Sequence, residues 1–201
     1  MKPGYDYDSP QSVYKLGRCY KTLPDFVPDL DGFVLHSKAK PTDFLSTSLT
    51  SRGYIINEKV KNILQNFKLP LHAFYPIELR YKKQLVNKYY WLHVICDLTG
   101  IVDYSASTFF IYKDYSYDLG VIKVSSKEEL LQKRSVIEEK NKGHNVTIWA
   151  KSLRLIEKVE YDFFKIGTYD SNKYISQKLY DTFNQEKTTG ITVKPLSWEF
   201  Y

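Results

Sequence analysis

The sequence KYYWLHVIC, residues 88–96, is apolar or aromatic at most successive positions, on both faces of any strand that it would form. A strand that is buried on two sides has this pattern, because its side chains alternate between the two faces. We therefore expect residues 88–96 to be a central strand with a layer of structure on each side. His93, within this run, fits a hydrogen-bonded core histidine better than a metal ligand, since no second ligand stands at metal spacing.

A helix and a strand are expected just before the central strand. Asn57 is a good helix N-cap, because its side-chain oxygen can accept a hydrogen bond from a free backbone N–H. Pro70 ends this helix, because proline cannot supply the next N–H, and residues 71–79 then predict a strand. The apolar residues of the helix have the i, i+3, i+4, i+7 spacing of one face: Val60, Ile63, Leu64 and Phe67.

The residues after the central strand predict further strands and another helix. Ser126 and Glu129 match a capping box, so a helix should begin there and end near Asn141, with Gly143 just beyond it. The helical residues expected to face the core are Leu130, Leu131 and Ile137. Strands are expected at residues 108–112, 120–124, 146–150 and 153–156.

The unit at residues 43–79 recurs near the C-terminus at an offset of 119 residues, which takes Asp43 to Asp162 and the cap Asn57 to Ser176. We interpret residues 43–79 and 162–198 as two copies of a strand–helix–strand module whose helices cover one sheet. Chance similarity between two capped helices remains the alternative interpretation.

The predicted fold class is α+β, with a mixed, mostly antiparallel sheet, two repeat-related amphipathic helices and a third helix. Residues 1–41 are rich in proline and glycine. They predict an extended N-terminal lead-in with one strand at residues 32–36. The α+β domain is expected to occupy residues 42–201.

Two helix starts share a short pattern, Ile56-Asn57-Glu58-Lys59-Val60 and Ile175-Ser176-Gln177-Lys178-Leu179. Between them, residues 89–94 form a strand-like run that is followed by Val102-Asp103-Tyr104-Ser105. Over residues 42–201 the chain resembles the immunity proteins of bacterial polymorphic toxin systems, in the myxobacterial-type family formerly catalogued as a domain of unknown function. The resemblance implies a protein that binds a cognate toxin tightly and blocks it inside the producing cell, without catalysis or a cofactor.

The charge balance permits a second class of partner. The chain has 29 Lys and Arg, 23 Asp and Glu, and a formal net charge of +6. Because the two signs alternate, a solvated, mildly basic surface is the simpler interpretation, and a basic nucleic-acid-binding module remains an alternative. With neither a secretory h-region nor an apolar run of membrane-spanning length, we expect a cytoplasmic protein without a membrane partner.

An enzymatic alternative depends on Ser46-Thr47-Ser48, with Arg18 upstream. These residues resemble the NAD-binding strand of arginine-dependent ADP-ribosyltransferases. The chain contains no E-x-E or Q-x-E element, which supplies the catalytic carboxylate in that chemistry. A degenerate NAD-binding protein is therefore the second hypothesis, and we assign no catalytic, cofactor-binding or metal-ligating residue.

Aromatic residues on a polar loop are typical of protein-binding hot spots, because rings provide contact area at low entropic cost. The loop between the strands at 108–112 and 120–124 has this composition. The candidate partner-binding residues are Tyr112, Asp114, Tyr115, Tyr117 and Asp118. An ordinary β-hairpin loop is the alternative interpretation.

Overall fold

The structure is a computed structural model that describes residues 1–46, 53–167, 169–170 and 172–196. It divides into two compact units, which are described separately. The first unit comprises Met1–Cys96, Tyr161–Phe164 and Tyr174–Val193; the second comprises the described residues of Asp97–Glu160, Lys165–Lys173 and Lys194–Tyr201. Helices and strands are both present and most strand pairs are antiparallel, which confirms the predicted α+β class.

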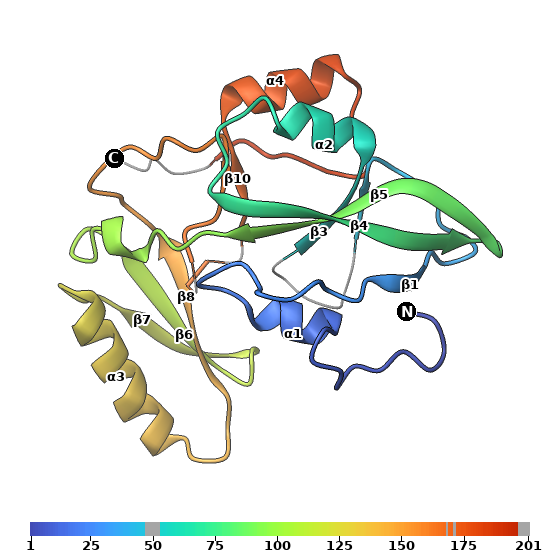
Figure 1. The fold of residues 1–201 in the computed structure, drawn as a ribbon. Coiled ribbons are helices and arrows are strands. Elements are labelled where there is room, and N and C mark those ends of the chain that lie inside the picture. The colour runs from blue at the N-terminus through green and yellow to red at the C-terminus, as the bar shows by residue number, and fades with distance from the viewer. Residues whose placement is uncertain (47–52, 168, 171, 197–201) are drawn as a thin grey trace. The chain divides into compact units, whose positions relative to one another are not determined.

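The first unit is built on a five-stranded sheet with the order β1-β4-β5-β3-β2 (Figure 1). Its strands are β1 (Asp31–Val34), β2 (Phe44–Leu45), β3 (Gly53–Asn57), β4 (Leu71–Tyr81) and β5 (Gln84–Ile95). Only β1 runs parallel to its neighbour, β4. Strand β5 is the middle strand, and Trp91, Leu92 and His93 on its two faces are all buried, which confirms the central strand predicted from residues 88–96.

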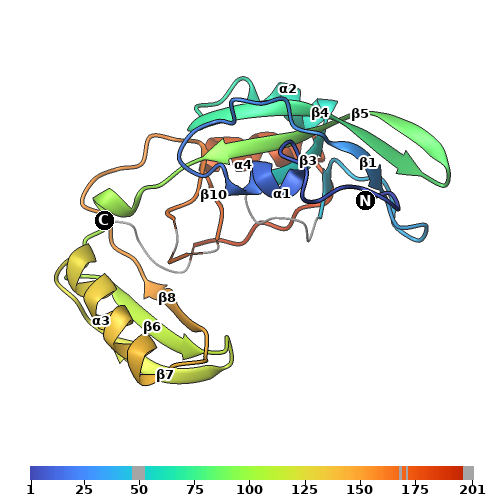
Figure 2. The ribbon, with the colours of Figure 1, turned by 60° about the horizontal axis from the view of Figure 1, so that its bottom comes forward.

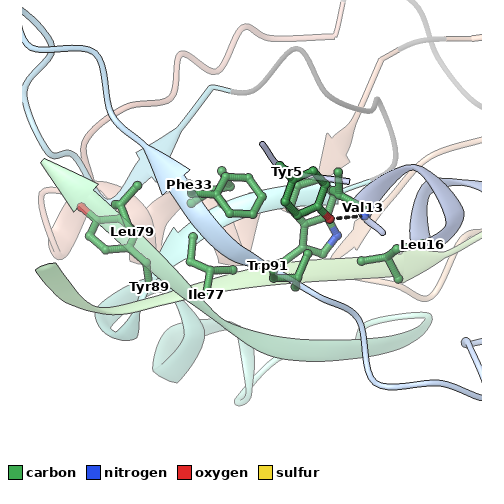
Figure 3. Close-up of a cluster of buried hydrophobic side chains, with 10 residues drawn as sticks. Tyr5, Val13, Leu16, Phe33, Ile77, Leu79, Tyr89 and Trp91 are labelled. Carbon is green, nitrogen blue, oxygen red and sulfur yellow. Dashed lines mark hydrogen bonds between the residues drawn. The ribbon is translucent and has the colours of Figure 1, made fainter. Parts of the chain in front are cut away.

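One face of this sheet is covered by the N-terminal segment that precedes β1 and includes helix α1 (Val13–Arg18). Figure 3 shows Trp91 packed among Tyr5, Phe33 and Leu16. The hydroxyl of Tyr5 accepts a hydrogen bond from the amide of Val13 at 2.8 Å. Residues 1–41 therefore contain a helix, a strand and part of the core, whereas the sequence suggested an extended lead-in. Strand β1 also ends at Val34, two residues before the end of the strand expected at 32–36.

The N-terminal segment was difficult to predict because its order comes from scattered contacts. Tyr5 also donates a hydrogen bond to the carbonyl oxygen of Asp29, 24 residues away, at 2.7 Å. His93 Nε2 lies 2.8 Å from the carbonyl oxygen of Cys19, so His93 is a hydrogen-bonded core histidine, as expected. Such long-range bonds leave no periodic signal in the local sequence.

The opposite face is covered by α2 (Glu58–Leu64) and α4 (Gln177–Gln185). Asn57 and Ser176 are their N-caps: Asn57 Oδ1 accepts from the amide of Val60, and Ser176 Oγ accepts from that of Leu179, both at 3.1 Å. Both caps were predicted. Each helix also has two fully or almost fully buried apolar residues, which makes it part of the framework: Val60 and Leu64 in α2, Leu179 and Phe183 in α4.

The surroundings of the two caps correspond position by position. Phe44 pairs with Ile56 between β2 and β3, and Phe163 pairs with Ile175 between β9 (Phe163–Phe164) and β10 (Tyr174–Ile175). These pairs are related by the offset that the sequence suggested. After α4, however, the described residues up to Leu196 contain no strand, although the proposed module has one there. The repeat of residues 43–79 and 162–198 stays a proposal.

An aspartate precedes each pair of strands and holds the cap of its own helix. Asn57 Nδ2 donates to Asp43 Oδ1, and Ser176 Oγ donates to Asp162 Oδ1, both at 2.7 Å. The second carboxylate oxygen of each aspartate accepts from the segment that follows the other helix: Asp43 from the Thr189 amide at 2.7 Å, and Asp162 from the Lys68 amide at 2.8 Å. We call these two aspartates, with their bonds, the reciprocal clasp.

The second unit contains a three-stranded antiparallel sheet with the order β7-β6-β8. Its elements are the 3-10 helix η1 (Thr99–Ile101), β6 (Thr108–Lys113), β7 (Tyr117–Ile122), α3 (Lys127–Lys140) and β8 (Val146–Ser152). Helix α3 packs against β8 along one face of this sheet (Figure 2). The strand expected at 153–156 is not formed; Leu155 makes only an isolated bridge with Val102.

Helix α3 begins at the predicted cap, with Ser126 Oγ accepting from the Glu129 amide at 3.1 Å. The Glu129 carboxylate accepts from the amide of Ser125, one residue earlier than a capping box requires. Leu130 is fully buried as expected, but Leu131 is 43% exposed, so its predicted inward position is wrong. Leu130 is the one buried residue of α3, so the apolar stripe that the helix turns toward the sheet is narrow.

Candidate partner-binding surface

The hairpin between β6 and β7 turns through Asp114, Tyr115 and Ser116. Asp114 and Tyr115 have positive φ angles of 51° and 60°, a conformation that aspartate tolerates better than most residues. The carboxylate of Asp114 accepts a hydrogen bond from the Asn145 amide at 2.9 Å and lies 2.7 Å from His144 Nδ1. The bond from Asn145, together with His144, lowers the pKa of Asp114. Asp114 therefore holds the turn in place.

Asp118 also makes a hydrogen bond within the hairpin, because its Oδ1 accepts from the Gly120 amide at 2.7 Å. The two tyrosines at the tip expose their rings instead: Tyr115 is 67% and Tyr117 is 65% exposed. The Lys113 ammonium lies 5.7 Å from the centre of the Tyr117 ring. The predicted set thus separates into aspartates that order the hairpin and tyrosines that are available for contact. We call Tyr115 and Tyr117 the hairpin tip.

The two faces of the three-stranded sheet differ sharply in burial. Phe109 and Ile111 of β6 are buried, as are Val146 and Ile148 of β8. The alternate residues form a cross-strand row on the other face, where Phe110 pairs with both Val121 and Trp149. We define the open face as Phe110, Tyr112, Leu119, Val121 and Trp149.

The open face is apolar but remains in contact with solvent. Trp149 is 37%, Leu119 44% and Val121 47% exposed. Phe110 and Tyr112 are half-buried, and their ring centres lie 5.8 Å apart. The Lys151 ammonium lies 5.1 Å from the centre of the Phe110 ring, so a cation borders the aromatic row. Contiguous exposed apolar patches of this kind mark interaction sites in soluble proteins.

Of the open face, only Tyr112 was proposed from the sequence, together with the loop between β6 and β7. The available signal was the run Phe109-Phe110-Ile111-Tyr112, which is apolar on both faces of one strand. Such a strand needs a cover on each side, and the second unit provides one helix. A comparison of the number of predicted helices with the number of strands that are apolar on both faces would have indicated a sheet face without a covering layer.

Metal ions, membranes and NAD are the other kinds of partner that the sequence raised. No cluster of three or more His, Cys, Asp or Glu side chains able to hold a metal ion occurs among the described residues. No helix within the described ranges is long and apolar enough to cross a membrane. The proposed NAD-binding residues Thr47 and Ser48 lie outside the described residues, while Ser46 is exposed.

Comparison with known protein families gives a match of almost full length. Residues 4–197 match the family model described as the immunity protein family (Imm11). No curated protein matches the sequence. The family match includes nearly all of the N-terminal segment, which the sequence resemblance had left out.

Proposed function

The chain belongs to the immunity protein family (Imm11), and from this premise we propose that it binds a cognate bacterial toxin domain and neutralises it by direct protein contact. The proposed contact surface combines the open face and the hairpin tip of the second unit. Blocking would follow from occupation of the toxin's surface, without any reaction on this chain. We place this interaction in the cytoplasm of the producing cell.

The observation that carries the proposal is the aromatic row on an uncovered sheet face. Trp149, Phe110 and Val121 stand side by side on three hydrogen-bonded strands, and a buried layer beneath them fixes the backbone. Rings presented on a rigid sheet lose little entropy when they bind, which is why tryptophan and tyrosine dominate interface hot spots. The adjacent cations suit the polar rim of such an interface.

The hairpin tip extends this surface beyond the end of the sheet. Tyr115 is anchored, because its hydroxyl accepts a hydrogen bond from Asn145 Nδ2 at 3.0 Å. Its ring is nevertheless the most exposed aromatic side chain among the described residues. An oriented and exposed ring can enter a pocket of the partner without first being ordered.

The test measures affinity for the purified toxin domain that is encoded beside the gene for this chain. We expect Trp149→Ala and the double variant Tyr115→Ala/Tyr117→Ala each to weaken binding about ten-fold or more, which corresponds to roughly 1.4 kcal/mol. The melting temperature of the double tyrosine variant should stay near that of the wild type, because both rings are mostly exposed, whereas Trp149→Ala should lower it, because Trp149 is only 37% exposed. Isothermal titration calorimetry and thermal unfolding provide the two measurements.

The matched control is Leu131→Ala on α3, which removes an exposed apolar side chain outside the proposed surface. It should leave the affinity unchanged. If all these variants bind like the wild type, the toxin contacts another surface. If the wild-type chain itself neither binds the toxin nor restores growth of cells that express it, the proposed function is wrong.

A further inference from the structure

Six basic side chains and no acidic one occur in two short stretches, residues 34–41 and 80–88. The stretches are distant in sequence but adjacent in the first unit. Val34 pairs with Arg80 across the β1–β4 ladder, and the Leu35 amide donates to the Arg80 carbonyl oxygen at 2.8 Å. The long β4–β5 hairpin and the segment after β1 thus meet at one end of the five-stranded sheet (Figure 1).

Two of the six cations are neutralised by neighbours. Arg80 Nε donates to Glu78 at 2.8 Å, and Lys88 Nζ donates to Glu58 at 2.7 Å. The other four are exposed and have no ion pair within the described part of the chain: Lys38, Lys40, Lys82 and Lys83. We call these four lysines the basic end.

Two of these lysines form the turn of the β4–β5 hairpin. Tyr81 pairs with Gln84, so Lys82 and Lys83 are a two-residue loop, with φ angles of 50° and 69°. Asparagine followed by glycine is preferred where both positions require a positive φ, because most other side chains are strained there. Lysine stands at both positions here, which places two exposed charges in the turn.

Apolar side chains accompany the basic end. Val34 is 52% and Leu85 is 54% exposed, and both lie on the strands that lead to it. The phosphate backbone of a nucleic acid needs cations but gains little from aliphatic contact, whereas protein interfaces combine both. We propose that the basic end is a second contact region, which attracts and binds an acidic surface of the toxin. This inference rests on the proposed function.

The test compares charge reversals of equal size in binding to the toxin domain encoded by the neighbouring gene. Lys82→Glu/Lys83→Glu should lower the association rate constant about ten-fold at low salt, because complementary charges steer encounter. The salt dependence of that rate should also become weaker. The control, Lys158→Glu/Lys173→Glu, reverses two exposed lysines of the second unit and should keep the wild-type rate.

Each outcome has a separate meaning. A wild-type chain that does not bind the toxin refutes the proposed function, whereas equal rates for both double variants refute only the role of the basic end. Retention of a labelled RNA or duplex DNA at physiological salt by the wild type, lost in Lys82→Glu/Lys83→Glu, would show that the basic end serves a nucleic acid and would also overturn this inference.

A second variant excludes a purely structural explanation. Lys82→Asn/Lys83→Gly supplies the preferred turn residues and removes both charges. We expect its melting temperature to rise by about 2–4 °C while association with the toxin slows. Slower association by a more stable protein cannot be attributed to misfolding, and an unchanged association rate would count against the proposal.

Discussion

Replacing Asp43 by alanine should destabilise the protein by about 2–3 kcal/mol, because the reciprocal clasp is opened on one side. The Asp43 side chain is only 13% exposed. Its carboxylate accepts hydrogen bonds from the Thr189 amide at 2.7 Å, the Thr189 hydroxyl at 2.8 Å and Asn57 Nδ2 at 2.7 Å. Each hydrogen bond to a charged group contributes about 1.5–3 kcal/mol to the free energy of unfolding.

The sum is smaller than three such bonds, because one of the donors, the Thr189 hydroxyl, can rotate toward water. The Asn57 amide keeps its orientation, because Asn57 Oδ1 caps α2. The Thr189 amide is fixed in the backbone, so it contributes most of the cost. Urea unfolding followed by circular dichroism gives the free energy, and Asp118→Ala, which loses one bond in the exposed hairpin, should cost less than about 1 kcal/mol.

Hydrogen exchange locates the effect. In the wild type the Thr189 amide should exchange slowly, and in Asp43→Ala it should exchange at nearly the rate of an open chain. A loss of less than about 0.5 kcal/mol, the range typical of neutral surface changes, together with continued protection of this amide, would refute the importance of the clasp.

Three further predictions concern the same unit. A Cβ at Gly53 would lie 2.0 Å from the ring of buried Trp91, so Gly53→Ala should lower the free energy of unfolding in urea by about 1–3 kcal/mol. The control Gly100→Ala, where a Cβ would have no neighbour within 4 Å, should lower it by less than about 0.5 kcal/mol. Gly190 has a φ of 86°, and a Cβ added there would lie 2.1 Å from the carbonyl oxygen of Phe44; Gly190→Ala should lower the melting temperature by several degrees. The free energy of unfolding of the wild type should fall as the pH drops below about 4. Asp43→Asn should make this fall shallower, and a variant with the same pH profile as the wild type would exclude Asp43 as a contributor.

The sign of the pH effect follows from the surroundings of Asp43. Burial opposes its ionisation, but the hydrogen bonds from Thr189 and Asn57 and the charge of Lys59 outweigh burial and lower its pKa. A carboxyl whose folded-state pKa is depressed contributes stability above its unfolded pKa. That contribution is lost as the pH falls through the folded-state value.

The features predicted correctly from the sequence are those whose physics is local. The caps Asn57, Ser176 and Ser126 each accept a bond from an amide three residues later, so residue type and spacing suffice to predict them. The central strand at residues 88–96 was equally visible, because its two-faced apolar pattern is contained in nine consecutive residues.

What the sequence did not reveal depends on partners far along the chain. Asp43 and Thr189 are 146 residues apart, and neither residue type alone indicates a clasp. The open face was missed for a related reason: Trp149, Phe110 and Val121 become neighbours only through the register of three strands. The candidate loop could be proposed because turn residues and tyrosines are adjacent in sequence, but the sequence could not separate anchoring aspartates from exposed rings.

The reciprocal clasp also means that the first unit can finish folding only late in translation. The first unit takes Tyr161–Phe164 and Tyr174–Val193 from beyond the whole of the second unit's main segment. At about 5–20 residues per second, helix α2 would emerge and wait several seconds before α4 and Thr189 arrive to cover its flank. A nascent chain halted near residue 160 would lack α4 and the bond partner of Asp43, so translation must pass the main segment of the second unit before the first unit is finished.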